Sequence, residues 1–153
     1  MSSDRLLLDN QLCFSLYATS LAMTQLYKPH LKQLGLTYTQ YTIMLILWEQ
    51  DALSLKAICE QLGQKPGALA PVIKRMESQG LLVRARGVDD DRALTIRLTD
   101  NGRALREQGL KVNQCVFEAC GLPGDKLRDL KHSLDHLRAR ITGSESDNTP
   151  PDR

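Results

Sequence analysis

The chain has 153 residues, of which 42% are hydrophobic and 25% are charged, and its formal net charge is +2. This length and composition are typical of one globular domain with a hydrophobic core, and the near-neutral charge means that any nucleic-acid-binding surface must be local. No apolar run approaches the roughly 20 residues that span a bilayer, and the first residues do not form a secretory signal, so we expect a cytoplasmic protein.

The cysteines are widely scattered along the chain, at Cys13, Cys59, Cys115 and Cys120. None lies in a CxxC pair or in a cysteine and histidine cluster with zinc spacing, so we expect no metal site and no cofactor. In a reducing compartment these cysteines should rest as thiols. We expect Cys59, on the inner side of a short helix, to be structural.

The first expected helix covers residues 10–34, where apolar side chains recur at helical spacing. Asp9 or Asn10 can cap its start, and Gly35 closes it. Pro29 weakens the helical pattern near the end of this segment.

Two further helices follow. The sequence TYTQ (37–40) has the form of a capping box and opens a helix that contains the continuous apolar run 43–48. Residues 54–63 form a short helix, with Ser54 as its N-cap.

The next segment, 64–80, is expected to be a helix with Gly67 as N-cap and Pro71 in the first turn, where its missing N–H does least harm. The period then changes. Residues 81–86 and 92–99 alternate in the manner of strands, and the polar residues between them predict a hairpin.

The C-terminal part is again helical. Thr99 or Asp100 caps a helix that reaches roughly to Phe117, and a glycine- and proline-containing break separates it from a last helix at about 126–141. The polar tail, 143–153, is expected to be disordered.

Helices followed by a hairpin and further helices predict a mainly α fold with a two-stranded β wing, that is, a winged helix-turn-helix. The helices at both ends of the chain have apolar faces left over. A symmetric dimer is the simplest way to bury them.

A local basic surface lies on the second short helix and the hairpin. A helix-turn-helix places its second helix in the major groove, and the hairpin then meets phosphates or the minor groove. The alternative is that these are ordinary solvated charges. Asp90 can brace the hairpin by pairing with Arg92. The candidate DNA-binding residues are Lys65, Gly67, Ala68, Lys74, Arg75, Arg84, Arg86 and Arg92.

The hairpin segment RARGVDDDRALTIRLTDNGRAL (84–105), with Asp90 and Arg92 in a D-x-R motif, resembles the MarR family of winged-helix repressors. The segments LDNQLCFSLYATS (8–20), YKPHLKQLGLTYTQY (27–41) and LILWE (45–49) resemble its OhrR group, whose members sense organic hydroperoxides. The match is continuous from about Leu8 to Arg106.

The resemblance implies one MarR-type domain over residues 1–142. Within it, dimerisation helices at about 9–36 and 107–142 flank a winged helix-turn-helix at about 37–106. It also implies a homodimeric repressor, not an enzyme, that releases double-stranded operator DNA when an organic hydroperoxide oxidises a cysteine.

Residue by residue, the resemblance makes Cys13 the peroxide-reactive cysteine. Tyr27 and Tyr38 match the tyrosines that hydrogen-bond its sulfur across the dimer interface, and Tyr17 matches a tyrosine implicated in the shift on oxidation. Cys115 and Cys120 flank the position of the resolving cysteine in two-cysteine members without occupying it, so either remains a candidate.

This chain departs from the family at QKPGALAP (64–71), where the recognition helix typically carries small hydroxyl residues. The missing hydroxyls predict different operator contacts.

Physical chemistry supports the same cysteine independently. Cys13 falls in the first turn of a helix, where unpaired N–H groups and the positive dipole end favour a thiolate. A thiolate attacks a peroxide to give a sulfenic acid. The alternative for Cys13 is a small core residue.

Two other functions remain open. One is a MarR-type repressor that responds to a small phenolic or aromatic ligand. The other is a thiol peroxidase, which would need a recycling reductant and a preorganised peroxide site.

Overall fold

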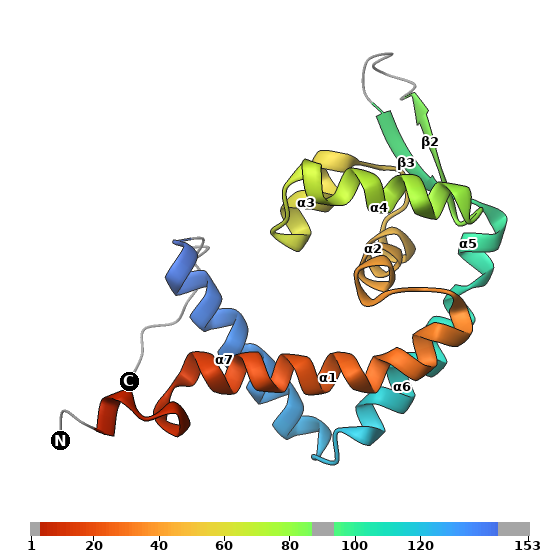
Figure 1. The fold of residues 1–153 in the computed structure, drawn as a ribbon. Helices are drawn as coiled ribbons and strands as arrows, with labels where there is room; N and C mark the ends of the chain where they lie inside the picture. The colour runs from red at the N-terminus through yellow and green to blue at the C-terminus, as the bar shows by residue number, and fades with distance from the viewer. Residues whose placement is uncertain (1–3, 87–93, 144–153) are drawn as a thin grey trace. The chain divides into compact units, whose positions relative to one another are not determined.

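A computed structural model of the protein describes residues 4–86 and 94–143 (Figure 1). The elements in chain order are η1 (Asp4–Leu6), η2 (Leu8–Asn10), α1 (Leu12–Leu34), α2 (Tyr38–Glu49), β1 (Leu53–Ser54), α3 (Leu55–Leu62), α4 (Pro66–Ser78), β2 (Leu82–Arg86), β3 (Leu94–Leu98), α5 (Asp100–Ala104), α6 (Arg106–Ala119) and α7 (Gly124–Thr142). The chain forms two compact units, with the boundary after Val116.

The first unit contains a winged helix-turn-helix, as the sequence predicts. Helices α2, α3 and α4 pack on one another, and α4 also packs on β2. Their apolar side chains form one core with residues from the sheet, and burying each large side chain contributes roughly 1.5–3 kcal/mol. The most deeply buried members are Tyr41, Ile43, Met44, Leu47, Ile58, Leu69, Ile73, Met76, Leu82 and Ile96.

The predicted caps of α2 and α3 are confirmed. The Thr37 hydroxyl accepts a hydrogen bond from the Gln40 N–H, and the Gln40 side chain accepts one from the Thr37 N–H, which completes the capping box. The Ser54 hydroxyl likewise accepts from the Ala57 N–H at 3.1 Å. These side chains determine where the helices begin.

The hairpin is confirmed, but the sheet has a third strand that the sequence did not reveal. Strand order is β1-β3-β2, and Leu82 pairs with Leu98 while Arg86 pairs with Leu94. Strand β1 is only two residues long, too short to show alternation. The predicted Asp90–Arg92 brace lies outside the described residues.

The predicted cap of α1 is wrong. The N-cap is Gln11 rather than Asp9 or Asn10, and it supplies no side-chain acceptor. The Asn10 side chain instead donates to the Asp4 carbonyl at 2.7 Å, so it is already committed outside the helix. The helix continues through Pro29 and ends at Gly35, whose φ of 71° is left-handed.

Two other boundaries differ from expectation. Helix α4 begins earlier than predicted, with Lys65 as N-cap and Pro66 as its first residue. Gly67 therefore lies inside the helix rather than capping it, and Pro71 lies in the second turn instead of the first. An N-terminal proline is already suited to the first helical position, which explains the earlier start.

The segment after β3 forms two helices rather than the single one predicted. Thr99 caps α5 through the Gly102 N–H, and Leu105 alone separates α5 from α6. Leu105 keeps a right-handed φ of −67°. No glycine or proline marks this break in the sequence.

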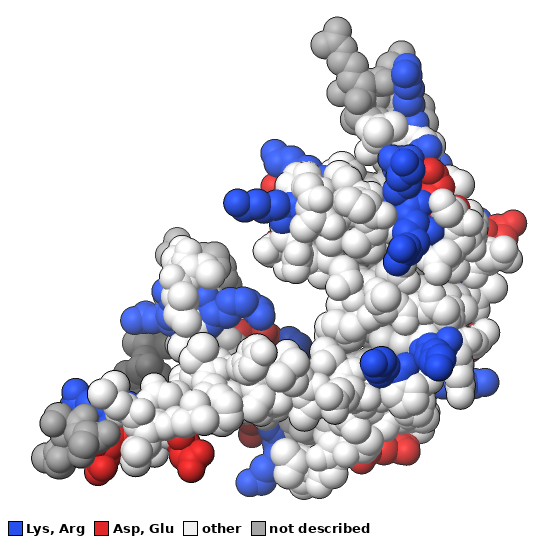
Figure 2. Space-filling view, viewed as in Figure 1, with Lys and Arg blue, Asp and Glu red and all other residues white. Residues whose placement is uncertain are grey.

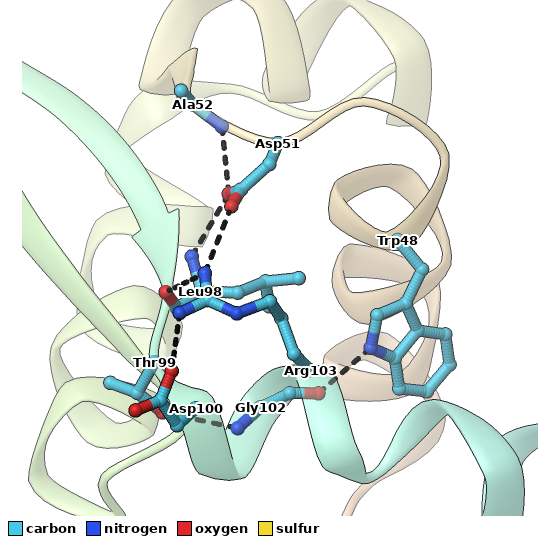
Figure 3. Close-up of polar contacts among 8 residues, drawn as sticks. All are labelled: Trp48, Asp51, Ala52, Leu98, Thr99, Asp100, Gly102 and Arg103. Carbon is cyan, nitrogen blue, oxygen red and sulfur yellow. Dashed lines mark hydrogen bonds and ion pairs between the residues drawn. The ribbon is translucent and has the colours of Figure 1, made fainter.

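Polar contacts hold the base of the wing to the end of α2 (Figure 3). Asp51 accepts hydrogen bonds from the N–H groups of Ala52 at 2.7 Å and Leu98 at 2.9 Å. Arg103 donates to the Leu98 carbonyl at 3.1 Å and forms an ion pair with Asp51 at 3.6 Å. The Asp51 carboxylate therefore links α2, β3 and α5.

Close helix packing completes this junction. The Trp48 indole donates to the Gly102 carbonyl at 2.9 Å (Figure 3). A Cβ on Gly102 would stand 2.1 Å from the Leu81 carbonyl oxygen, and one on Gly109 would stand 2.7 Å from the Trp48 ring. Both positions therefore require glycine.

Replacing the carboxylate at the centre of this junction should be costly. We expect Asp51→Ala to lower the free energy of unfolding by about 1–3 kcal/mol, because it leaves the Leu98 N–H without its side-chain acceptor. Urea unfolding followed by circular dichroism measures the change. Asp100→Ala is the matched control: Asp100 pairs with the same Arg103 but is 99% exposed, so its loss should cost less than about 1 kcal/mol. Equal effects of the two substitutions would contradict this assignment.

Candidate functional site

Cys13 is the second residue of α1 and is exposed in the isolated chain. Because the N-cap Gln11 offers no side-chain acceptor, the N–H groups of the first turn keep their positive partial charge. Tyr17 lies one turn later on the same helix face and is 63% exposed. The predicted placement of Cys13 in the first turn is thus confirmed.

The other predicted tyrosines lie together, where α1 meets α2. The ring centroids of Tyr27 and Tyr38 are 5.2 Å apart. Tyr41, which the sequence did not single out for the site, completes the cluster at 5.6 Å from Tyr27 and 6.4 Å from Tyr38. Tyr38 is 43% exposed, whereas Tyr41 is buried.

Tyr41 is the buried member of this cluster. Burial raises the pKa of its phenol, and Tyr38 raises it further, while the Asn113 side chain has a smaller opposing effect. The Tyr41 hydroxyl lies near Asn113 but makes no hydrogen bond with a described residue. Tyr41 therefore stays neutral at physiological pH.

Cys13 and this tyrosine cluster are far apart within one chain. Both Cys13 and Tyr27 lie on α1, and the helical rise of about 1.5 Å per residue separates them by roughly 21 Å. No side chain spans that distance. A contact between Cys13 and Tyr27 or Tyr38 therefore requires a second subunit.

The same argument applies to Cys115, the first candidate partner thiol. Cys115 is exposed on α6 and borders a cavity that His30 and Leu34 of α1 also line. His30 is about 26 Å along α1 from Cys13, whereas a disulfide needs Cα atoms within about 7 Å. A Cys13–Cys115 disulfide within one chain is thus excluded.

The remaining cysteines differ in environment. Cys120 belongs to the second unit and is partly buried. Cys59 is 4% exposed and packs in the core, as its expected structural role requires.

Basic side chains gather over α4 and along β2 (Figure 2). Lys65 is the N-cap of α4, and Lys74 is exposed near its middle. Gly67 and Ala68 are exposed in its first turn, so the start of α4 presents backbone and a methyl group. In a helix-turn-helix, the corresponding end of the second helix is the one that reaches base edges, so the contact of these residues with DNA stays a prediction.

Arg84 is committed to a contact within the chain. Its side chain donates to Glu77 of α4 at 3.1 Å, and its backbone N–H donates to the same carboxylate at 2.9 Å. These hydrogen bonds hold the pKa of Glu77 below its usual value, and the bond from the Arg84 backbone N–H has the larger effect. Arg84 therefore braces the wing against α4.

Arg86 is better placed to meet DNA. It lies two residues beyond Arg84 on the same face of β2, the face that packs on α4, and it is exposed. Arg97 of β3 pairs with Val83 and so projects from the opposite face. Because side chains alternate along a strand, Arg86 faces the recognition helix and Arg97 does not.

Arg75 points elsewhere than its sequence position suggests. It lines a cavity of about 630 Å³ together with Lys28 and Lys32 of α1. The interpretation of Arg75 as a DNA contact stays a prediction, since the structure places it at the boundary between α4 and α1.

A family model described as transcriptional regulator SarA/Rot matches residues 25–108, more than half of the chain. The chain belongs to this family. Its members are transcriptional regulators rather than enzymes, and their fold is the MarR-type winged helix.

Individual relatives in this SarA/Rot and MarR-type group are similar over most of their length. The organic hydroperoxide resistance transcriptional regulator of Bacillus subtilis is 43% identical over 131 residues, which cover 86% of this chain and 89% of the relative. Reduced AbfR bound to DNA, a protein of Staphylococcus epidermidis, is 36% identical with a TM-score of 0.74, covering 92% of this chain and 98% of that one. Disulfide-formed AbfR is 34% identical with a TM-score of 0.63, covering 94% and 95%.

The Glu77–Arg84 brace predicts a pH effect with a definite sign. Because the pKa of Glu77 is lowered in the folded state, its stabilisation is present above the unfolded value of 4.5 and is lost as the pH falls through the folded value. Glu77→Gln should therefore reduce the loss of stability between about pH 5 and pH 3, measured by urea midpoints across that range. Glu60→Gln, which removes an exposed carboxylate from α3, should leave the wild-type pH dependence in place. A Glu77→Gln profile that parallels wild type would rule out the brace.

Proposed function

We propose that this protein is a homodimeric repressor that binds operator DNA and releases it when an organic hydroperoxide oxidises Cys13. The observation that carries the proposal is the arrangement of α1, with an exposed cysteine at its start and a tyrosine pair about 21 Å away. A two-fold dimer would bring each cysteine to the other subunit's tyrosines. The 43% identity to an organic hydroperoxide resistance regulator supports the same effector class.

The oxidation step follows from these groups. The Cys13 thiolate attacks the terminal oxygen of the hydroperoxide, so that an S–O bond forms while the O–O bond breaks. The alkoxide leaves as an alcohol after taking up a proton, and the sulfur becomes a sulfenic acid. Hydroxyls of Tyr27 and Tyr38 from the partner subunit would donate hydrogen bonds that stabilise the thiolate beforehand.

A second thiol would then attack the sulfenic sulfur, forming a disulfide and releasing water. Because Cys115 cannot reach Cys13 in its own chain, it would act as Cys115 of the partner subunit. Cys120 remains the other candidate. The disulfide-formed structure of AbfR supports this chemistry as accessible to a related chain.

The dimer would be built by helices at about 9–36 and 107–142, which flank the DNA-binding part at about 37–106. Large apolar side chains on these helices are exposed in the isolated chain and would be covered by a partner. They include Phe14, Tyr17, Leu21, Met23, Leu110, Phe117 and Leu130.

DNA binding would use two copies of α4, one in each of two successive major grooves about 34 Å apart. Arg86 and Arg92 of the wing would meet phosphates or the minor groove alongside. A movement of α1 against its partner would change the spacing of the two α4 helices and so release the operator. A regulator of this kind acts on the chromosome, so the cytoplasm is its expected location. Among the described residues, no helix is long and apolar enough to cross a membrane.

The redox proposal predicts a specific loss. Cys13→Ser should bind a DNA fragment carrying the operator as tightly as wild type in reducing buffer, but cumene hydroperoxide should no longer release it, because serine cannot form a sulfenic acid. A gel-shift titration measures both properties. Cys59→Ala should still respond, since Cys59 is buried in the core.

Several outcomes would count against this assignment. Release of Cys13→Ser by peroxide would exclude the sensor role. Release by a phenolic ligand that persists after thiol blocking would favour the ligand-responsive repressor instead. Repeated turnover of peroxide, rather than one oxidation per cysteine, would indicate a thiol peroxidase.

The wing makes a separate prediction about DNA affinity. Arg86→Ala should weaken binding and make the dependence of log affinity on log salt less steep by about 1 for each phosphate that the side chain no longer neutralises. Arg97→Ala removes the same charge from the opposite face of the hairpin and should change the slope much less. Fluorescence anisotropy across a series of salt concentrations resolves the two slopes. Equal slopes for both variants would show that Arg86 does not bind a phosphate.

A further inference from the structure

The segment before α1 is folded although it buries nothing. We call residues 4–12, which comprise this segment and the first residue of α1, the N-terminal arm. Its turns η1 and η2 are fixed by hydrogen bonds from the Asn10 side chain to the Asp4 carbonyl at 2.7 Å and from the Gln11 side chain to the Arg5 carbonyl at 2.6 Å. Its leucines are nevertheless exposed, with Leu6 at 86%, Leu7 at 54%, Leu8 at 59% and Leu12 at 62%. An ordered run of exposed leucines indicates a surface that another molecule covers.

A cavity of complementary character lies between α1, α2 and α4. Its volume is about 630 Å³, and its floor includes Leu31 and Leu36. Lys28, Lys32 and Arg75 surround it, no acidic residue lines it, and none of these cations forms an ion pair with a described residue. Basic side chains are visible over the C-terminal part of α1 and over α4 (Figure 2). The cavity thus suits an apolar segment that carries carboxylates.

Two side-chain amides, the buried Gln40 and the exposed Gln79, connect the walls of this cavity. Gln40 is 2% exposed, and its side chain donates to the Gln79 side chain at 3.3 Å. Gln79, the C-cap of α4, donates in turn to the Gly35 carbonyl at 3.1 Å. The cavity is therefore bordered by both α1 and the recognition helix, which these hydrogen bonds connect.

The proposed dimer places the arm near this cavity. If Cys13 meets Tyr27 of the partner subunit, two-fold symmetry requires the reverse contact as well. The two α1 helices then run antiparallel, and the axis passes near Ser20, midway between those positions. The arm precedes Leu12, so it leaves α1 toward the end of the partner's α1 that carries Lys28 and Lys32, and Leu8 is the arm residue nearest Lys32 in this arrangement. Residues 4–10 span roughly 12 Å at the 3₁₀ rise, enough to pass both Lys28 and Lys32, which lie about 6 Å apart along α1.

We propose that the N-terminal arm of each subunit docks in this cavity of the other subunit. Its leucines cover the apolar floor, and Asp4 and Asp9, which outnumber the arm's one cation, Arg5, face the basic rim. The proposal rests on the proposed function, because the contact between Cys13 and the tyrosines sets the register. The arm joins the sensing cysteine to the partner's α4, so that a displacement at Cys13 reaches a DNA-reading helix directly through Arg75.

Disulfide trapping tests the docking. In a protein carrying Cys13→Ser, Cys115→Ser and Cys120→Ser, the pair Leu8→Cys and Lys32→Cys should form a covalent dimer when oxidised with diamide. Non-reducing gels and peptide mass spectrometry identify the bond. The control pair, Leu8→Cys with Arg97→Cys on the outer face of the wing, should give at least tenfold less covalent dimer. Absence of the bond in a protein that light scattering shows to be dimeric, or equal yields from both pairs, would overturn the proposal.

Charge exchange gives a second measurement. Asp9→Lys and Lys32→Glu should each raise the dimer dissociation constant at least fivefold in low salt, and the double variant should return it to within twofold of wild type. Analytical ultracentrifugation at low protein concentration measures the dimer dissociation constant of each variant. An unchanged dissociation constant in all three variants would show that the arm does not lie in the interface.

The two proposals fail in different ways. A missing cross-link together with Cys13-dependent release by cumene hydroperoxide would reject the docked arm and keep the redox repressor. A cross-link together with a wild-type Cys13 that does not react with cumene hydroperoxide would reject the redox function and keep the docked arm.

Discussion

The length of α1 constrains the rest of the molecule. A helix that runs from Leu12 to Leu34 without a break carries a cysteine near one end and tyrosines toward the other, and neither end can fold back on the other. In the proposed function these two ends are the two halves of one site, which a single chain cannot bring together. Two-fold association resolves this geometry, because it supplies each end of α1 with the opposite end of a second copy.

Polar contacts link α1 to α4, and α4 to the wing, within the first unit, so a proposed movement of α1 would be passed to α4 and the wing. Gln79 ties the end of α4 to the end of α1, and Glu77 ties α4 to the wing through Arg84. Asp51 and Arg103 hold the base of the wing to α2 and α5. These are hydrogen bonds and ion pairs at the edges of one packed core, and packed cores respond to displacement by shifting as rigid bodies rather than by deforming.

Much of this fold could be predicted because its signals are local. Thr37 and Gln40 form a capping box, Ser54 caps a helix, and the change to alternating residues at 81–86 marks a strand. Cys13 could be recognised for the same reason, since its position in a first turn depends only on neighbouring sequence.

The features that escaped prediction depend on contacts between distant residues. Strand β1 exists because Leu53 pairs with Ile96, and Tyr41 joins the aromatic cluster because α2 packs against α1. Arg84 has the sequence position of a DNA contact, but the packing of β2 on α4 brings it to Glu77. The start of α4 was misplaced because Pro66 and Gly67 are each acceptable at a helix start, and only the backbone decides between them.

The first two turns of α4 have a consequence for how an operator is read. Pro66, Gly67, Ala68 and Pro71 are exposed there, and none has a side chain that can donate or accept a hydrogen bond. Pro71 also lacks the N–H that would pair with the Gly67 carbonyl four residues earlier, which leaves that oxygen open. A smooth, methyl-bearing helix end of this kind fits against thymine methyl groups and follows the width and bending of the duplex. Discrimination among base sequences would then come mainly from duplex shape and stiffness, with cations around the helix holding the backbone in place.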